Sequence, residues 1–451
     1  MRSVPYRNII RLVWPLALGM ANNALMQFAD RAFLARDSML ALEAVLPATT
    51  LAWIFMSFFQ SIVGYAGVFV AQYHGAGDRA NCSLSYRAAL VIAAMAGLLM
   101  VPLVPLGNWI FAKTAASAEL LAMERTYYDI IAATGFLVFG QMAATSYFTG
   151  RGEPRVVFWV NVLGNLVNII LDPLLIFGWC GFPHLGIAGA AYATVFALAL
   201  QFAALAVLAE RDMRSTRRSG RTAGPLLPLA ARILRYGIPA GGYEVLNMAS
   251  FTIFVFVTGR VGDIAFAASN ACFSVNYLLF APMAGFAIGA QTLVGQALGR
   301  NDAEEARIAL KRTLILGVGF VAALSLAAVV LYDPILSLFF APTTGAETAG
   351  ARQEFFSTGF WLMALMATWQ VFDATDVIVS GALKGAGDTR FVMLWMLVCA
   401  FGFWMPLLFL VYSRRPTMPA LWSTMIAYVV VICIGTLCRW LRGPWRSIRL
   451  V

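Results

Sequence analysis

The sequence predicts an all-α polytopic membrane protein, with twelve transmembrane helices in two six-helix lobes related as parallel repeats. The first observation is composition: 61% of the residues are hydrophobic and 12% are charged, against about 25% charged in soluble domains. The second is that nearly continuous apolar stretches, each long enough to cross a bilayer, recur along the chain without the period-two alternation of barrel strands. The third is an internal repeat, in which segments of the first half recur at a constant spacing in the second.

Twelve apolar stretches are the candidate spans, and short polar or arginine-containing connections separate them. The first is too long for a cleaved signal peptide and is not followed by a small-residue cleavage site. The predicted spans are 8–34, 43–72, 88–112, 122–149, 156–179, 186–209, 232–258, 264–297, 311–331, 353–384, 391–412 and 418–439.

The repeat divides these spans into two sets of six. RLVWPLALG at 11–19 matches RYGIPAGGY at 235–243, and AQYHGAGDRA at 71–80 matches GQALGRNDAE at 295–304. Six spans separate the copies, so both copies cross the membrane in the same direction, which is one arrangement of secondary transporters. We therefore expect three segments, namely an N-lobe at 1–209, a basic cytoplasmic linker at 210–230 and a C-lobe at 231–451.

The arginines and lysines are concentrated in every second connection. The net charge of +10 would suggest a nucleic-acid partner in a soluble protein, but here it follows the positive-inside rule. We expect a multi-pass protein of a bacterial-type inner membrane with both termini in the cytoplasm. Its partners would be the lipid bilayer and small molecules, with no nucleic acid, and it would act as a monomer.

The first span carries a proline near its start and an acid near its end. Pro15 removes one backbone hydrogen bond and favours a bend in the helix. Asp30 is costly inside a membrane, by roughly 2.5–3.5 kcal/mol at mid-helix, so it is a functional-site hypothesis by default.

Three further polar residues are expected at the height of Asp30. At 1.5 Å per residue, Asp30 lies roughly 30 Å from the inner end of its span and Asp172 roughly 25 Å from the inner end of its own. Asn168 lies one turn before Asp172, and Thr194 descends to a similar level on the next span. Together these oxygens suit a proton or a hard cation such as Na⁺. The alternative is a polar network that only packs helices.

A second acidic set is expected nearer the membrane midplane in the other half. Glu244 and Asp373 are each about 15 Å from the inner end of their spans, and Asp376 lies one turn further in than Asp373. They are candidates for binding a cationic substrate or a proton. The alternative is that one of them, Asp376 above all, faces a cytoplasmic vestibule.

These motifs together resemble the multidrug and toxic compound extrusion (MATE) family. The residues that carry the resemblance, over both halves, are WPLALG…FADRAFLAR (14–36), NIILDPLLIFG (168–178), GIAGAAYATV (186–195), YGIPAGGYEVL (236–246), VGQALGRNDAEEAR (294–307) and FDATDVIVSGALKGAGDTR (372–390).

The resemblance implies a twelve-helix antiporter that uses H⁺ or Na⁺ entry to expel cationic drugs. It implies that Asp30 is the acid of the first span and Pro15 its bending proline. Asn168, Asp172 and Thr194 match the cation site of DinF-like members, whereas Glu244 and Asp373 match the acids of NorM-like members. Carrying both sets departs from the simplest DinF-like pattern, and the coupling ion stays open.

The expected function is therefore ion-coupled export of amphipathic organic cations, with no enzymatic activity and no cofactor besides the coupling ion. Six cysteines without a CxxC pair and two distant histidines, His74 and His184, offer no metal site. The principal alternative is a flippase for lipid-linked sugars, whose cavity should hold deep arginines or lysines instead of acids. A prenyl-transfer enzyme would need a second Asp-rich motif beside Asp373 and Asp376, and a channel would need rings of charge.

Overall fold

The fold is described from a computed structural model, and the described residues are 5–217, 223–340, 347–448 and 450–451. This part of the chain is helical and contains no strand. Eleven of its helices are long and apolar enough to cross a membrane, or twelve if the pair α6 and α7, bent by 44°, is one span. The predicted all-α membrane fold is confirmed. Arg218 and Arg221 of the predicted linker lie outside the described residues.

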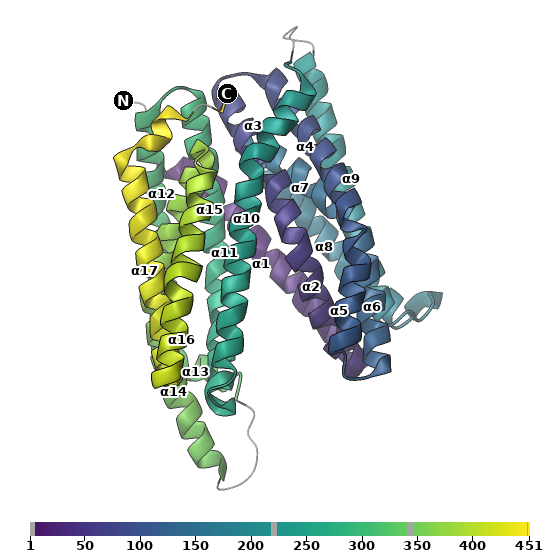
Figure 1. Cartoon of the computed structure of the whole chain (residues 1–451). Coiled ribbons are helices and arrows are strands. Elements are labelled where there is room, and N and C mark those ends of the chain that lie inside the picture. Colours follow the sequence, from purple (N-terminus) through teal and green to yellow (C-terminus); the bar gives the residue numbers. More distant parts are fainter. Residues whose placement is uncertain (1–4, 218–222, 341–346, 449) are drawn as a thin grey trace. The chain divides into compact units, whose positions relative to one another are not determined.

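The described residues up to 258 form ten α-helices and one short 3-10 helix, Trp179–Gly181 (Figure 1). Their bounds are α1 (Tyr6–Asp37), α2 (Met39–Gly64), α3 (Ala66–Gly75), α4 (Arg79–Met100), α5 (Leu103–Thr114), α6 (Ala118–Ala133), α7 (Gly135–Gly150), α8 (Pro154–Ile176), α9 (Ile187–Arg217) and α10 (Leu226–Thr258).

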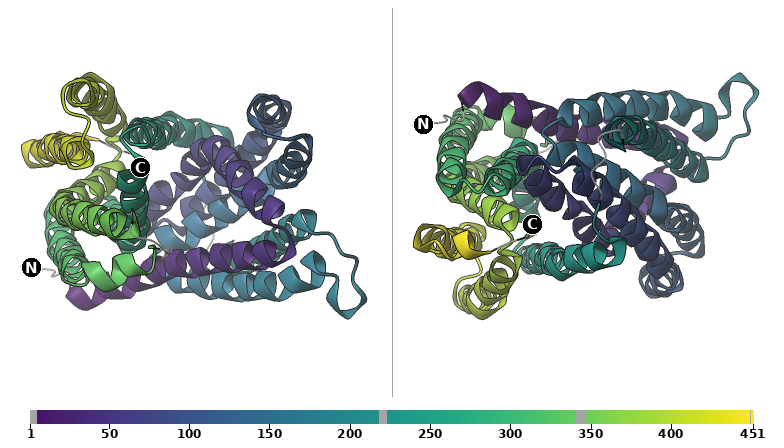
Figure 2. Two further views of the ribbon diagram at one scale, coloured as in Figure 1. Left: turned by 90° about the horizontal axis from the view of Figure 1, so that it is seen from below. Right: turned by 90° about the horizontal axis from the view of Figure 1, so that it is seen from above.

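The described residues after 258 form seven α-helices, one π-helical segment and one short 3-10 helix, Pro444–Ser447. Their bounds are α11 (Asp263–Gly299), α12 (Ala303–Val330), α13 (Tyr332–Ser337), α14 (Glu347–Ala386), α15 (Thr389–Leu397), the π-helical η2 (Val398–Trp404), α16 (Met405–Arg414) and α17 (Met418–Arg442). Figure 2 shows the same helices from both ends.

Four predicted spans consist of more than one observed segment. The span expected at 43–72 comprises α2 and α3, and the one expected at 391–412 comprises α15, η2 and α16. The span expected at 88–112 consists of α4 and the separate α5, because Pro102, which directly precedes α5, supplies no backbone N–H to continue the helix. The span expected at 122–149 bends at Thr134, which lies between α6 and α7.

The described chain forms two compact units. Unit 1 comprises Met1–Ala17, Val245–Val294 and Ala303–Arg449, and unit 2 comprises Leu18–Glu244, Gly295–Asp302 and Leu450–Val451. The helices α1, α10 and α11 therefore each contribute residues to both units. The division between lobes at 209 and 231 stays a prediction.

The internal repeat is visible in the backbone at the ends of α3 and α11. Gly77 and Asn301, which are equivalent positions of the repeat, both have positive φ, of 73° and 59°. The following acids donate their N–H groups to equivalent carbonyls, Asp78 to Tyr73 at 2.9 Å and Asp302 to Ala297 at 3.0 Å. These are helix ends with a left-handed residue, where glycine or asparagine is favoured.

Within unit 2, these two helix ends contact each other through equivalent residues. A Cβ atom added to Gly75 would lie 2.0 Å from the carbonyl oxygen of Gln296, and one added to Gly299 would lie 1.9 Å from the carbonyl oxygen of Gln72. The contact is reciprocal, as at a two-fold axis. Gln296 Nε2 also donates to the carbonyl of Gly150 at 2.9 Å.

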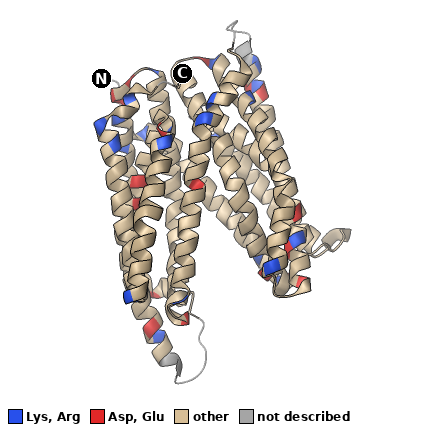
Figure 3. Ribbon diagram, in the orientation of Figure 1, with Lys and Arg blue, Asp and Glu red and all other residues tan. Residues whose placement is uncertain are grey.

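The charged residues gather toward the helix ends, and the middle parts of the helices carry few of them (Figure 3). This distribution agrees with helices that cross a bilayer, because a charge at the bilayer centre is costly.

Candidate functional site: a buried carboxyl pair

The N-terminal candidate site lies in unit 2, where α1, α8 and α9 meet. Asp30 is 8% exposed, whereas Asp172 and Asn168 are fully buried. On α8, Asn168 and Asp172 are four residues apart and therefore share a face. Asp30, Asn168 and Asp172, which the sequence predicted at one site, lie together in the structure. Their role in ion binding stays a prediction.

Asn168 links the three helices. In the amide orientation that satisfies both groups, its nitrogen donates to Asp30 Oδ1 at 2.9 Å and its oxygen accepts from the backbone N–H of Thr194 at 3.2 Å. The Thr194 hydroxyl, expected to face the site, instead donates to the carbonyl of Ala190 on its own helix at 3.1 Å. This back-bond is the common choice of a threonine inside a helix.

The two carboxyl groups lie near each other. The side chains of Asp30 and Asp172 are close enough to interact electrostatically. Neither oxygen of Asp172 receives a hydrogen bond from a donor of the described residues. Ionised carboxylates only accept hydrogen bonds, so such a pair needs a proton or a cation between its members. The arrangement is chemically suited to exchange a bound proton for a bound cation.

A tyrosine that the sequence did not single out lies beside this pair. Tyr127 of α6 is 7% exposed and lies near Thr49 and near both Asp30 and Asp172. A buried tyrosine hydroxyl usually has a polar partner. Tyrosines are common in this chain, and nothing in the local sequence distinguishes this one.

The C-terminal acids lie on α14 in unit 1. Asp376 is 2% exposed and accepts hydrogen bonds from Thr436 Oγ1 at 2.7 Å and Ser380 Oγ at 3.5 Å. Asp373 is half-buried and lies within electrostatic range of Asp376. Asp376 is thus held within the helix bundle of its unit by α17, which accounts for its burial.

Glu244 and Pro15 lie at the limits of the two units. Glu244, half-buried on α10, is the last residue of its segment of unit 2. Its pairing with Asp373 in unit 1 stays a prediction. Pro15 is internal to the continuous helix α1, and α1 passes from unit 1 to unit 2 between Ala17 and Leu18.

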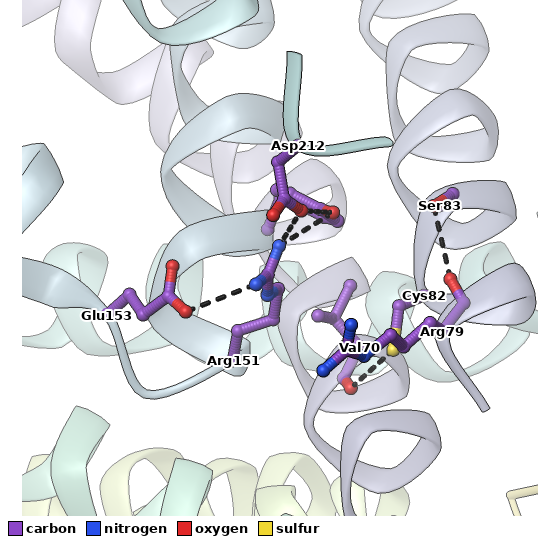
Figure 4. Close-up of polar contacts among 8 residues, drawn as sticks. Val70, Arg79, Cys82, Ser83, Arg151, Glu153 and Asp212 are labelled. Atoms are coloured by element: carbon purple, nitrogen blue, oxygen red, sulfur yellow. Dashed lines mark hydrogen bonds and ion pairs between the residues drawn. The ribbon is translucent and has the colours of Figure 1, made fainter. Parts of the chain in front are cut away.

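A separate polar cluster joins the end of α7 to α9 in unit 2 (Figure 4). Arg151 forms an ion pair with Asp212 and a second one with Glu153 at 3.1 Å. The Tyr147 hydroxyl donates to Asp212 at 2.6 Å, and the guanidinium of Arg151 lies over the Tyr147 ring. A small pocket here is lined by His74, Arg79, Cys82, Tyr147, Arg151 and Asp212. We interpret the cluster as a tie between helix ends.

Within the described residues, no group of three or more His, Cys, Asp or Glu side chains is placed to hold a metal ion. The site described above has two acids, Asp30 and Asp172, and its third polar side chain, Asn168, is an amide.

The fold and the buried carboxyl pair together describe a polytopic membrane transporter. The chain belongs to the MatE family, which it matches over residues 15–174 and 239–410. The two matched segments begin at Pro15 and Pro239, which are equivalent positions of the internal repeat.

Two bacterial relatives are each named probable multidrug resistance protein NorM. The one from Bradyrhizobium diazoefficiens is 29% identical over 405 residues, covering 88% of this chain and 83% of that protein. The one from Pseudomonas aeruginosa is 28% identical over 410 residues, covering 88% and 80%.

Two solved structures show the same fold at low sequence identity. A MOP superfamily transporter from Pyrococcus furiosus is 17% identical with a TM-score of 0.83, covering 99% of this chain and 97% of that chain. The eukaryotic MATE transporter AtDTX14 is 16% identical with a TM-score of 0.83, covering 98% and 96%.

Proposed function

We propose that this chain is an H⁺- or Na⁺-coupled antiporter that exports amphipathic organic cations by alternating access. The observation that carries the proposal is the proximity of two interacting buried carboxyl groups, Asp30 and Asp172, within two membrane-spanning helices. Two neighbouring acids bind a proton or a monovalent cation in one state and repel each other when it leaves. Binding and release then change the energy of the helices that carry them.

Alternating access would use this energy through α1. Asp30 lies in unit 2, and α1 continues past Pro15 into unit 1. A helix with an internal proline bends at low cost, because one backbone hydrogen bond is already absent. Cation binding at Asp30 would thereby favour one conformation of α1 over another, which is what coupling requires.

The export of cationic drugs is proposed from charge and from the relatives. Asp373 and Asp376 place carboxyl groups inside a membrane helix of unit 1, and Glu244 does so on α10. Carboxylates attract organic cations, and the relatives are named multidrug resistance proteins. We further propose an inner-membrane location with both termini cytoplasmic, lobes at 1–209 and 231–451, and one chain as the transport unit.

The decisive experiment is dye efflux from proteoliposomes with a pH gradient or a Na⁺ gradient imposed separately. We expect one gradient to drive efflux in the wild type. The matched control is Asp333→Asn, which removes an exposed carboxylate of α13 and should leave efflux unchanged. Efflux that ignores both gradients in the wild type would refute the coupling.

The two acidic sets should be separable by drug binding. Asp172→Asn should uncouple the ion from the drug yet still bind drug, because it alters the carboxyl pair alone. Glu244→Gln combined with Asp373→Asn should weaken drug affinity by about 1–3 kcal/mol, the range for lost charge-assisted contacts. The assignment is wrong if purified Asp172→Asn loses drug affinity while the double variant keeps it.

A further inference from the structure

Unit 2 contains a chain of amide side chains two helical turns from the carboxyl pair, which we name the amide layer. Gln141 Nε2 donates to Gln201 Oε1 at 2.6 Å, Gln201 Nε2 to Asn165 Oδ1 at 2.9 Å, and Asn165 Nδ2 to Asn23 Oδ1 at 2.9 Å. Asn161 joins through its side chain, which accepts from Gln141 at 3.2 Å, and through its carbonyl, which accepts from Gln201 at 3.4 Å. The layer thus links α7, α9, α8 and α1.

The amide layer repeats the arrangement of the carboxyl site. Asn23 precedes Asp30 by seven residues on α1, and Asn165 precedes Asp172 by seven on α8. Seven residues are about two turns and about 10.5 Å along one face of a helix. The Asn23–Asn165 hydrogen bond and the Asp30–Asp172 pair therefore span the same 142 residues, as expected for neighbouring parallel helices.

The third helix, α9, shows the same seven-residue spacing, but its amide follows the site residue in the sequence instead of preceding it. On α9, Gln201 follows Thr194 by seven residues. Asn165 contacts Gln201 in the layer, and Asn168 contacts Thr194 in the site, so α9 runs antiparallel to α8. All three helices consequently present an amide at one level and a member of the carboxyl site at the other.

The layer is buried and closely fitted on α8 and α9. Asn165 is 3% exposed and Gln201 is 4% exposed. A Cβ atom on Gly164 would lie 2.3 Å from Gln201 Cγ, so the glutamine occupies the space left by this glycine. The amide nitrogens of Gln201 and Gln141 each make two of the hydrogen bonds given above. A buried polar network with its donors satisfied rigidifies the elements that it joins.

We propose that Asn23, Asn165 and Gln201 are positioning residues that fix the register of α1, α8 and α9, and so set the affinity of the carboxyl pair for the coupling cation. This inference rests on the proposed ion coupling. Two carboxylates repel each other whenever the site is empty, so the helices need another contact that holds them at one level. Amides suit this task because they bond in a directional way and carry no charge that would replace the cation.

The position of Asn23 makes α1 the adjustable member. It is exposed on its other side, and among the described contacts its link to the layer is the bond from Asn165. Loss of this bond leaves α7, α8 and α9 joined, and the described hydrogen bond between α1 and α8 is then the one from Asn168 to Asp30 in the site itself. A shift of α1 along α8 then strains that bond and changes the distance between Asp30 and Asp172.

The test is the coupling-ion dependence of dye efflux in proteoliposomes, measured for Asn23→Leu, Asn165→Leu and the double variant, together with dye affinity of each purified protein. We expect Asn23→Leu, which removes one hydrogen bond, to raise the half-maximal concentration of the driving ion about five- to tenfold. Asn165→Leu also removes the bond from Gln201 and should raise it at least as much. The double variant should add little to Asn165→Leu, because that change alone already removes the bond to Asn23. Dye affinity should stay at the wild-type value.

The matched control is Ser146→Ala, which removes a buried hydroxyl of α7 that donates to the carbonyls of Met142 and Ala143 on its own helix. It should leave the half-maximal ion concentration unchanged. An unchanged ion dependence in folded layer variants overturns the inference, as does an equal loss of ion and dye affinity. Should the leucine variants not fold, Asn23→Ser at the exposed edge of the layer provides the same comparison.

The inference and the proposed function fail in different ways. Wild-type efflux that responds to neither gradient removes the coupling itself, and the inference with it. Wild-type efflux that is coupled, with layer variants that match it, refutes the positioning role alone.

Discussion

The reciprocal contact between the ends of α3 and α11 predicts a large effect of Gly75→Ala. The new Cβ atom would lie 2.0 Å from the carbonyl oxygen of Gln296, 2.8 Å from its carbonyl carbon and 3.0 Å from its Cα. All three atoms belong to the backbone, so no side-chain rotation relieves the overlap. The helix ends must separate by roughly 1.4 Å to reach ordinary van der Waals contact.

The magnitude follows from overpacking and from one hydrogen bond. Extra methylene groups in a closely packed contact cost about 1–3 kcal/mol. Separation of the two ends also strains the 2.9 Å bond from Gln296 to the carbonyl of Gly150, which contributes about 1 kcal/mol. We therefore expect Gly75→Ala to destabilise this arrangement by about 2–4 kcal/mol. Gly299→Ala should cost as much, because its Cβ would lie 1.9 Å from the oxygen of Gln72.

Thermal unfolding of the purified protein and the initial rate of dye efflux together test this expectation. The matched control is Gly319→Ala on α12, where a Cβ atom meets nothing within 4 Å and alanine is the better helix former. The control should keep or raise the melting temperature, whereas both contact variants should lower it and slow efflux. Wild-type melting and efflux in Gly75→Ala would show that the close approach is unnecessary.

Three further substitutions test other parts of the structure. Asp30→Asn should abolish coupled efflux while the protein remains folded, because the amide keeps the shape but cannot ionise; wild-type efflux by a well-expressed variant would refute this. Pro15→Ala should slow turnover with little change in drug affinity, because it restores a backbone hydrogen bond in α1; an unchanged rate in a variant with a straight α1 would exclude bending from the cycle. Arg439→Leu should lower the melting temperature by an amount equivalent to about 1–3 kcal/mol, because it leaves the buried Asp388 without hydrogen bonds of 2.7 and 3.3 Å, and an unchanged melting temperature would contradict it.

The sequence predicted the membrane fold and the carboxyl pair for the same physical reason. A charged side chain is so costly in hydrocarbon that each one stands out against the apolar background. Helical rise predicted Asp30 and Asp172 at one height, and in the structure the two side chains lie close enough to interact; their role in ion coupling stays a prediction. The match to the MatE family confirms the resemblance that these motifs carry.

The amide layer and Tyr127 could not be predicted in this way. Asparagine, glutamine and tyrosine are less costly in a membrane helix than a charge, so their positions do not stand out. Which of these polar side chains contact each other depends on how each helix is rotated about its axis, and the sequence does not give that rotation. The hydroxyl of Thr194 illustrates the point: its height was predicted, but in the structure it bonds to its own helix.

The repeat constrains the backbone more strongly than it constrains the polar chemistry. Gly152 and Gly387 both have positive φ, of 82° and 97°, in the turns that follow α7 and α14. Asp30, however, has Phe254 as its counterpart in the second copy of the repeat. Phe254 is fully buried and stacks on Trp404, with ring centroids 5.5 Å apart. An acid in one half thus corresponds to an aromatic packing residue in the other.

The ion pairs at the helix ends also differ between the two halves. In unit 2, the residue at the turn after α7 is the cation Arg151, and its partner Asp212 is on α9. In unit 1, the residue at the turn after α14 is the anion Asp388, and its partner Arg439 is on α17. Each pair joins a turn to the last long helix of its half, but from different positions, because Asp388 corresponds to Glu153 in the repeat and Arg151 corresponds to Ala386. Because duplicated backbones hold different side chains in this chain, an ion site in one half does not require a second one in the other, and the two acidic sets are free to have different tasks.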